Sequence, residues 1–231
     1  AAVSFAKERM GVAFLDLSTG EFATTEGSAA LVDKLLAGYR PKEILVERST
    51  RLLYDSQLTY RTYIFEADDW LFIPSNNQER LLRHFAVRNF KGFGLEGMES
   101  AVTAAGAILH YLDLTQHNEL GHIASLHRID EEQYVRIDGF TARSLELLTT
   151  MNPEGCSLKD ILDRTYTPMG ARLLRQWIAF PLKSVAAIEE RQSVVRALVD
   201  DAQARFVLEE HLREMGDLER TASKVSMKRI S

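Results

Sequence analysis

The sequence has little cysteine, no long apolar run and no surplus of basic residues. A single cysteine, Cys156, excludes an internal disulfide framework and a zinc site built from cysteines, and it suits a reducing cytosol. No apolar run approaches the ~20 residues of a membrane span, and no basic and apolar leader is present. The formal net charge of −5 argues against a domain that binds nucleic acid through a large basic surface.

The first half of the chain alternates strands and helices. Its 231 residues fit one large or two modest domains, and an apolar content of 45% is enough to build a core. Gly20 supplies the positive φ of a hairpin turn, which predicts an antiparallel meander of the first strands. Strands are expected at residues 2–5, 10–16, 21–25, 43–47 and 63–65.

Helices are expected between and after these strands. The first should end near Gly38, because glycine suits a helix C-terminus. The longest covers residues 99–117 and is a candidate bridge to the second half. The predicted helices of the first half are 29–36, 76–85 and 99–117.

The second half is mainly helical after a brief strand at residues 134–137. The last predicted helix begins at Leu218 and shows no terminating residue before Ser231, so we expect a piece of a longer chain. The other helices are expected at 141–148, 158–162, 168–180, 185–199 and 205–213.

The segment 157–182 is the most informative part of the sequence. Apolar residues at helical spacing, Leu158, Ile161 and Leu162, predict a short helix with one buried face. Thr167 can cap the next helix, and Pro168 suits its first position because the missing N–H would be unpaired there. Off the apolar stripe of this helix lie Arg172, Arg175 and Lys183, which we interpret as a solvated face in preference to nucleic-acid contacts.

This segment resembles the MutS family of DNA mismatch repair proteins. The similarity also extends over GVAFLDLSTGEF at Gly11, EILVE at Glu43, GFGLE at Gly92, ERQSVVRAL at Glu190 and GDLER at Gly216. The resemblance implies an α/β ribonuclease-H-like connector domain at residues 1–127, followed by a mainly α-helical lever, or core, segment at residues 128–231.

The resemblance implies a mechanical role. Rigid helices would relay the state of a distant ATPase to a DNA clamp, and the connector would dock a MutL-like partner. ATP and Mg²⁺, mismatched duplex DNA and a second MutS subunit are expected only for a longer parent protein in the bacterial cytoplasm, associated with the nucleoid. A ribonuclease-H-like nuclease or resolvase and a generic helical interaction module are the alternatives.

Two motifs of the family are absent from the sequence. No G-x-x-x-x-G-K-[ST] phosphate-binding loop occurs, and no Phe is followed two residues later by Glu, as in the mismatch-reading wedge. Without backbone amides and a lysine to cradle a triphosphate, we expect no nucleotide to bind here. We therefore expect no catalytic, cofactor or metal site in these residues.

Three other patterns are each better explained without a ligand. The glycines of Gly92-x-Gly94-x-x-Gly97 match a dinucleotide fingerprint but no strand precedes them, so they predict a helix entry. A nuclease site could use carboxylates near strand ends, for which solvated turn acids are the simpler interpretation: Asp16, Glu47 and one of Asp68 or Asp69. A zinc cluster of His110, His117, His122 and His127 is disfavoured, because the last three are spaced by five and successive rings then lie on different faces.

Two surfaces are candidates for binding. On helix 76–85, Leu81, Leu82 and Phe85 should face inward, which leaves four polar residues as candidate contacts of the MutL-like partner: Gln78, Glu79, Arg80 and Arg83. Near the end of the sequence, a weaker hypothesis assigns DNA phosphate contacts to Lys224, Lys228 and Arg229. Arg220 of the same group is expected to pair with Asp217 or with another helix.

Overall fold

The computed structural model describes residues 1–6, 9–115, 120–130, 133–135, 137, 139–152 and 154–226. The chain forms two compact units. The first, called here the α/β unit, comprises Ala1–Ile129 and the segment from Ala222; the second, the helical unit, comprises Asp130–Thr221. The described helices include none that is long and apolar enough to cross a membrane.

The α/β unit is built on a six-stranded mixed sheet in the order β5-β4-β1-β2-β3-β6. The predicted antiparallel meander is confirmed, since β1 pairs with β2 and β2 pairs with β3 in antiparallel fashion. The remaining pairs are parallel, and they join β1 to β4, β4 to β5 and β3 to β6. The strands are β1 Ala2–Phe5, β2 Met10–Leu15, β3 Phe22–Gly27, β4 Glu43–Glu47, β5 Tyr63–Ala67 and β6 His127–Arg128.

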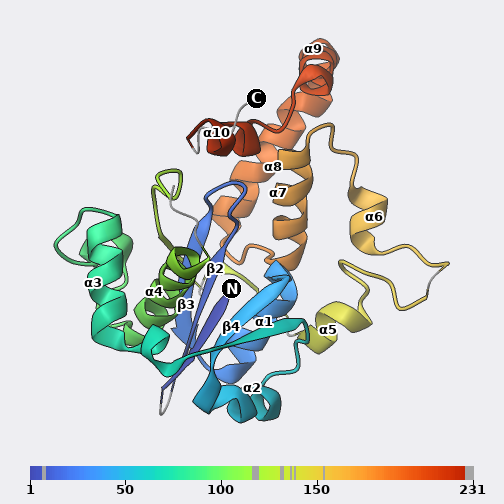
Figure 1. Cartoon of the computed structure of the whole chain (residues 1–231). Coiled ribbons are helices and arrows are strands. Elements are labelled where there is room, and N and C mark those ends of the chain that lie inside the picture. The colour runs from blue at the N-terminus through green and yellow to red at the C-terminus, as the bar shows by residue number, and fades with distance from the viewer. Residues whose placement is uncertain are drawn as a thin grey trace. The chain divides into compact units, whose positions relative to one another are not determined.

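Helices cover both faces of the sheet (Figure 1). Side chains alternate along each strand, so Ala2 and Ala13 face helix α4 (Glu99–Leu114) while Val3 and Val12 face the opposite side, which carries α1 (Ala29–Tyr39). The shorter elements are η1 Arg48–Thr50, α2 Arg51–Gln57, η2 Asp69–Phe72, α3 Pro74–His84 and η3 Lys91–Phe93.

Helix α4 is the centre of the α/β core. It is buried from Ser100 to Leu109 and again at Leu112, as expected for a helix that is apolar almost all round. Its alanines allow close approach to β2, where a Cβ on Gly11 would lie 1.9 Å from the Ser100 carbonyl oxygen. The expectation of a bridge to the second half is therefore wrong, because this helix packs on the sheet and ends at Leu114.

The helical unit confirms most predicted helices and the predicted cap at Thr167, and it shows a second cap at Ser157. Ser157 accepts a hydrogen bond from the Asp160 amide in a capping box, and Thr167 accepts one from the Gly170 amide, with Pro168 in the first turn. The helices are α5 Gly139–Ser144, α6 Leu158–Leu162, α7 Pro168–Ala179, α8 Val185–Asp200, α9 Ala202–Glu214 and α10 Leu218–Ser226, the last of which continues past this unit.

Several predicted boundaries are corrected by the structure. Helix α1 continues through Gly38 to Tyr39, and its C-cap is Arg40, whose φ of 49° places it in the left-handed region. Helix α5 ends at Ser144, earlier than predicted, and the backbone becomes left-handed at Glu146, with a φ of 48°. Tyr134 forms an isolated bridge with Leu182 in place of the predicted strand.

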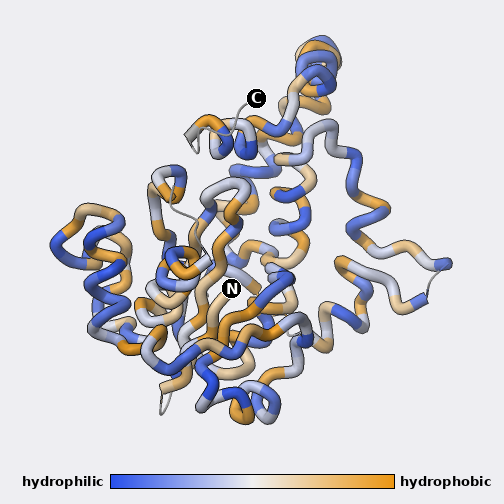
Figure 2. The backbone as a smooth tube through the Cα atoms, in the orientation of Figure 1, coloured by the Kyte–Doolittle hydropathy of each residue, from blue (hydrophilic) through white to orange (hydrophobic). Residues whose placement is uncertain are grey.

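Burial in the helical unit differs from the prediction. The expected buried face of α6 is exposed, at 42% for Leu158, 56% for Ile161 and 49% for Leu162. Among the described residues of this unit, the buried apolar side chains are Ile178 and Phe180. Figure 2 accordingly shows apolar and polar residues interleaved along its helices. These helices therefore have little apolar core of their own.

Candidate functional site

Helix α3 carries the predicted partner contacts. Pro74 occupies the first turn after an extended Ile73, and the helix turns Asn77 and Leu81 into the protein. Leu81 is fully buried, and Leu82 and Phe85 pack partly buried against the core, as predicted. Of the four candidates, Gln78, Glu79 and Arg83 are exposed. The outward face of α3 is therefore open to a partner.

Arg80 lies at the seam between α3 and α4. Its Nε donates to Asp113 Oδ2 over 2.8 Å, and its Nη2 donates to Oδ1 over 3.0 Å. The guanidinium fork matches both carboxylate oxygens, so this bidentate pair fixes orientation as well as charge. The Arg80 side chain is only 17% exposed. It holds α3 on α4 through two of the five N–H donors of its guanidinium group.

A close backbone approach fixes the same seam. A Cβ on Gly106 of α4 would lie 2.4 Å from the Cβ and 2.6 Å from the Cα of Asn77, so only glycine fits there. The side chain of Asn77 is fully buried, and its Nδ2 donates to the Leu71 carbonyl oxygen over 2.9 Å. This hydrogen bond connects the start of α3 to η2. Helix α3 is thus a rigid part of the α/β unit.

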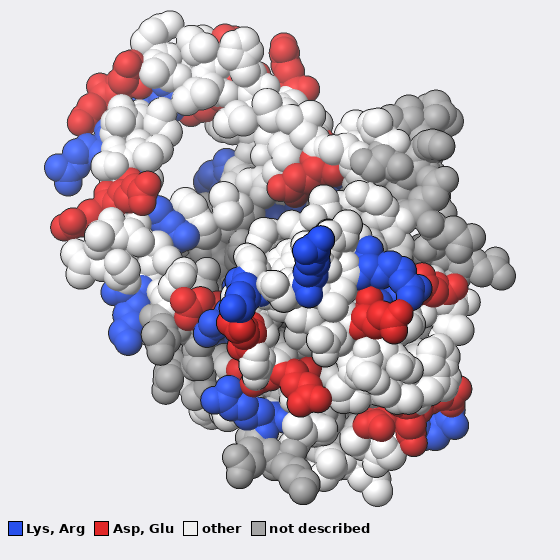
Figure 3. Space-filling model, turned by 90° about the vertical axis from the view of Figure 1, so that its left-hand side faces the viewer, with Lys and Arg blue, Asp and Glu red and all other residues white. Residues whose placement is uncertain are grey.

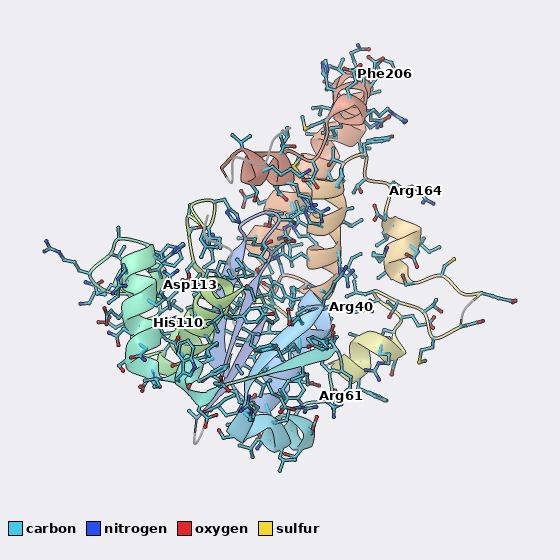
Figure 4. All side chains as sticks on the ribbon, in the orientation of Figure 1. Arg40, Arg61, His110, Asp113, Arg164 and Phe206 are labelled. Atoms are coloured by element: carbon cyan, nitrogen blue, oxygen red, sulfur yellow. The ribbon has the colours of Figure 1, made fainter. Side chains whose placement is uncertain are left out.

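Two partly buried histidines border this seam. Burial lowers the pKa of His110, and burial likewise lowers the pKa of His84 below the ordinary value, so both rings are neutral at pH 7. The edge of the His110 ring meets Trp70 of η2 at a centroid distance of 5.8 Å. Figure 4 shows His110 and Asp113 on α4 beside α3. Both rings act here as packing groups.

Charges of both signs alternate on the α3 side of the α/β unit (Figure 3). Glu79 and Arg83 form an ion pair of 2.6 Å one turn apart, with 72% and 73% of their side chains exposed. Lys91 and Glu96 form a second exposed pair at 3.6 Å. Such pairs stabilise a fold little, so their side chains are free to serve recognition.

Asp16 does not come together with the other carboxylates of the nuclease alternative. β1 pairs with β2 in antiparallel and with β4 in parallel fashion, so the carboxyl ends of β2 and β4 point in opposite directions along the strands. Asp16 instead accepts hydrogen bonds from the amide and hydroxyl of Ser18 in the turn. Asp68 pairs with Arg48 at 2.9 Å, and burial with the charge of Asp69 raises the pKa of Glu47. The interpretation as turn acids fits this geometry.

Two of the four histidines contact oxygen atoms of other residues. His122 Nε2 contacts the Leu17 carbonyl oxygen at 3.0 Å, and His127 contacts the Ser125 hydroxyl at 3.0 Å. His117 lies outside the described residues. Within the described part of the chain, no group of three or more His, Cys, Asp or Glu residues could hold a metal ion.

The glycine pattern leads into a helix, as predicted. No strand precedes Gly92, which lies in η3, and the backbone is left-handed at Gly94 and Gly97, with φ of 66° and 75°. Two residues later α4 begins with Glu99. The glycines therefore shape the entry to α4.

The basic residues near the end of the sequence divide into paired and exposed groups. Arg220 lies 3.5 Å from the Asp217 carboxylate, as expected, and Lys224 is exposed on α10. Lys228 and Arg229 lie outside the described residues. Arg172, predicted to be solvated, instead makes a bidentate pair with Asp217 at 2.8 Å for both contacts, and this prediction is wrong.

Two of these pairs could not be predicted from local sequence patterns. Arg80 and Asp113 are 33 residues apart, and Arg172 and Asp217 are 45 residues apart, so helical spacing cannot connect them. The acidic residues of GDLER were visible as a motif, but no local pattern shows which arginine they meet.

Comparison with known proteins identifies the family. The family model described as MutS domain II matches residues 1–124, and the model described as MutS domain III matches residues 140–231. Domain II contains α3 and its seam with α4. The chain belongs to the MutS family, and its fold is an α/β connector of ribonuclease-H-like type followed by a mainly helical segment.

Bacterial relatives resemble the chain over its whole length. Each is named DNA mismatch repair protein MutS: the relative from Porphyromonas gingivalis is 55% identical, that from Bacteroides thetaiotaomicron 51% and that from Parabacteroides distasonis 50%. All of the chain is covered in each comparison, but only 26–27% of the relative. The chain thus spans about a quarter of the length of these mismatch repair proteins.

Proposed function

We propose that this chain is the connector and the first part of the lever of a mismatch repair protein, and that it relays conformational state and docks a partner. A relay needs elements that move as units, since packed elements shift between discrete arrangements. The buried α4 and its seam with α3 support this role for the α/β unit. Domain matches over most of the chain support the assignment.

The partner surface that we propose is the outward face of α3, and the partner is a MutL-like protein. The observation that carries it is the rigid presentation of exposed polar side chains. Gln78, Glu79 and Arg83 project from a helix that the Arg80–Asp113 pair and the Asn77–Gly106 approach hold in place. Preorganised side chains lose little entropy on binding, which favours recognition.

Charge reversal tests this surface. Glu79→Lys combined with Arg83→Glu keeps an ion pair of the same spacing on α3 but inverts its charge pattern. Binding to an immobilised MutL-like protein, taken from a bacterium whose MutS resembles this chain, can be measured by biolayer interferometry. We expect the affinity to fall by about tenfold or more, which corresponds to a loss of ~1.4 kcal/mol of binding free energy. Thermal unfolding should not change, because both side chains are exposed.

The matched control is the inverted pair Lys91→Glu with Glu96→Lys. It is an equally exposed ion pair of the same unit and lies off α3. Its reversal should leave the affinity for the partner unchanged. Equal affinity of both reversed variants and the parent chain would remove the α3 assignment, and equal weakening would indicate attraction by overall charge.

Nucleotide and mismatched DNA are proposed to bind elsewhere in a longer protein. ATP with Mg²⁺, mispaired duplex and a second subunit then have no site of their own on this chain. A coupled ATPase assay and a duplex-binding assay on the 231-residue chain should both stay at background. Turnover that follows the purified chain through chromatography would contradict this division.

Lys224, with Lys228 and Arg229, is proposed as a weak contact for DNA phosphates in that longer protein. The exposed position of Lys224 on α10 supports the proposal. Phosphate contacts release counterions, so affinity falls with salt in proportion to their number. Replacing Lys224 and Lys228 with alanine in the longer protein should reduce this salt dependence. An unchanged salt dependence would exclude these residues.

A further inference from the structure

The α8–α9 hairpin of the helical unit has few apolar anchors. Many of its apolar side chains are exposed, with 58% for Val195 and 56% for Phe206. Each helix is capped from within, because Ser184 binds the Ala187 amide and Asp201 binds the Ala204 amide. The N-cap hydrogen bonds therefore stabilise each helix by itself, but they do not attach the helices to α7. Contacts other than apolar packing must hold the hairpin against α7.

The first attachment is ionic. Arg172 in the middle of α7 donates from both Nη atoms to the Asp217 carboxylate, and its Nε donates to Glu219 over 3.1 Å. Asp217 also accepts from the Arg220 amide over 3.2 Å, so it caps the start of α10 at the same time. One arginine thus fixes the chain that returns from the hairpin against α7.

Two further attachments place an arginine on an aromatic ring. The Arg213 guanidinium of α9 lies 4.3 Å from the centroid of Tyr166, whose hydroxyl donates to Glu209 over 3.1 Å. The Arg191 guanidinium of α8 lies 3.9 Å from the centroid of Trp177 on α7. Both distances are within the ~6 Å of a cation–π contact. The aromatic partners are 40% and 37% exposed, so solvent reaches both contacts.

We propose that these contacts of Arg172, Arg191 and Arg213 form a releasable joint between the segment 166–179, which contains α7, and the α8–α9 hairpin with the start of α10. The Arg172–Asp217 pair is partly buried, with 29% and 16% of the two side chains exposed, and solvent reaches the two cation–π contacts. Ionic contacts that solvent reaches are weakened by salt, whereas buried apolar packing is not. Release therefore detaches the hairpin as a unit and leaves its helices formed. The joint gives the helical unit two discrete arrangements, attached and released, that an external load or ligand can select.

A distance measurement between spin labels tests the joint. Cys156→Ser removes the native thiol. Spin labels are then attached to cysteines introduced by Arg164→Cys, before α7, and Phe206→Cys, in α9, at the two positions marked in Figure 4. At ~0.1 M salt we expect one narrow distance distribution, and at ~1 M, where the Debye length falls to ~3 Å, a broader and longer one. Replacing Arg172, Arg191 and Arg213 with alanine should give the broad distribution at both salt concentrations.

Helicity and a matched arginine separate release from unfolding. Circular dichroism should show unchanged helix content in the triple variant and at high salt. Arg196→Ala, an exposed arginine on α8, should behave as the labelled parent does. A distribution that stays narrow at high salt and in the triple variant would overturn the joint. Loss of helix in the triple variant would also overturn it, because the contacts would then be required for folding.

Discussion

The α/β unit and the helical unit are stabilised by different kinds of contact. In the first, α4 is buried against the sheet along most of its length. In the second, the described helices bury few apolar side chains, and arginines connect them to α7. Both units contain well-capped helices, so helix formation and core formation are separate properties of this chain.

This difference bears on the proposed relay. Close-packed interiors transmit displacement because they have low compressibility, and the α/β unit meets that condition. Ionic contacts that solvent reaches can be exchanged for contacts with water or a ligand, and contacts of this kind connect the elements of the helical unit. A stiff part and an adjustable part in one chain suit a mechanical role.

The largest expected effect is the truncation of a buried side chain in α4. Leu109 is fully buried, so Leu109→Ala leaves a cavity and should lower the free energy of unfolding by about 3 kcal/mol. The matched change Val195→Ala in the exposed face of α8 should alter it by less than ~0.5 kcal/mol. Chemical denaturation followed by circular dichroism measures both. Similar losses for the two variants would contradict the contrast between the units.

Gly11 tests the close approach of β2 and α4. An alanine Cβ at this position would overlap the backbone of Ser100 and Ala101, so the helix must move away from the sheet. We expect Gly11→Ala to destabilise the α/β unit by roughly 2 kcal/mol. Chemical unfolding of the α/β unit can be followed by the fluorescence of Trp70 in a Trp177→Phe background.

Gly92→Ala is the control for that substitution. Its added Cβ has no neighbour within 4 Å, so stability should change little. An equal loss from both substitutions would mean that backbone freedom, and not the approach to α4, explains the glycine at position 11.

Sequence reasoning predicted elements better than contacts. Periodicity and caps located the meander, α3 and α8, because those signals are local to each element. The role of α4 was missed, since an apolar helix of 16 residues has the same pattern whether it spans two parts or packs on a sheet. Burial depends on neighbours that local patterns do not specify.

The candidate site shows the same limit. The outward positions of Gln78, Glu79 and Arg83 followed from the apolar stripe of one helix. The engagement of Arg80 with Asp113 did not, because it depends on how two helices pack. The short strand β6 was also missed, as two residues carry no alternation to detect.

A smaller effect is expected from the ion pair of the helical unit. Hydrogen bonds from Arg172 lower the pKa of Asp217 to about 2, from an ordinary value of 3.8. A lowered pKa means that the stabilisation is complete above about pH 4 and is lost as the pH falls towards 2. Carboxyl NMR titration should show this pKa return towards 3.8 in Arg172→Ala, and in Arg196→Ala it should stay near 2. If the pKa of Asp217 stays low in Arg172→Ala, the amides at the start of α10, and not Arg172, cause the shift.

The smallest effect is expected on the surface of α3. Glu79→Ala removes one exposed i,i+4 ion pair, which should lower the free energy of unfolding by only ~0.3 kcal/mol. Thermal unfolding of this variant should therefore nearly overlay that of the parent chain. A loss above ~1 kcal/mol would show that Glu79 supports the fold. A loss near zero would show that the fold does not need the charge of Glu79. The side chain is then available for partner recognition, because changing it does not affect stability.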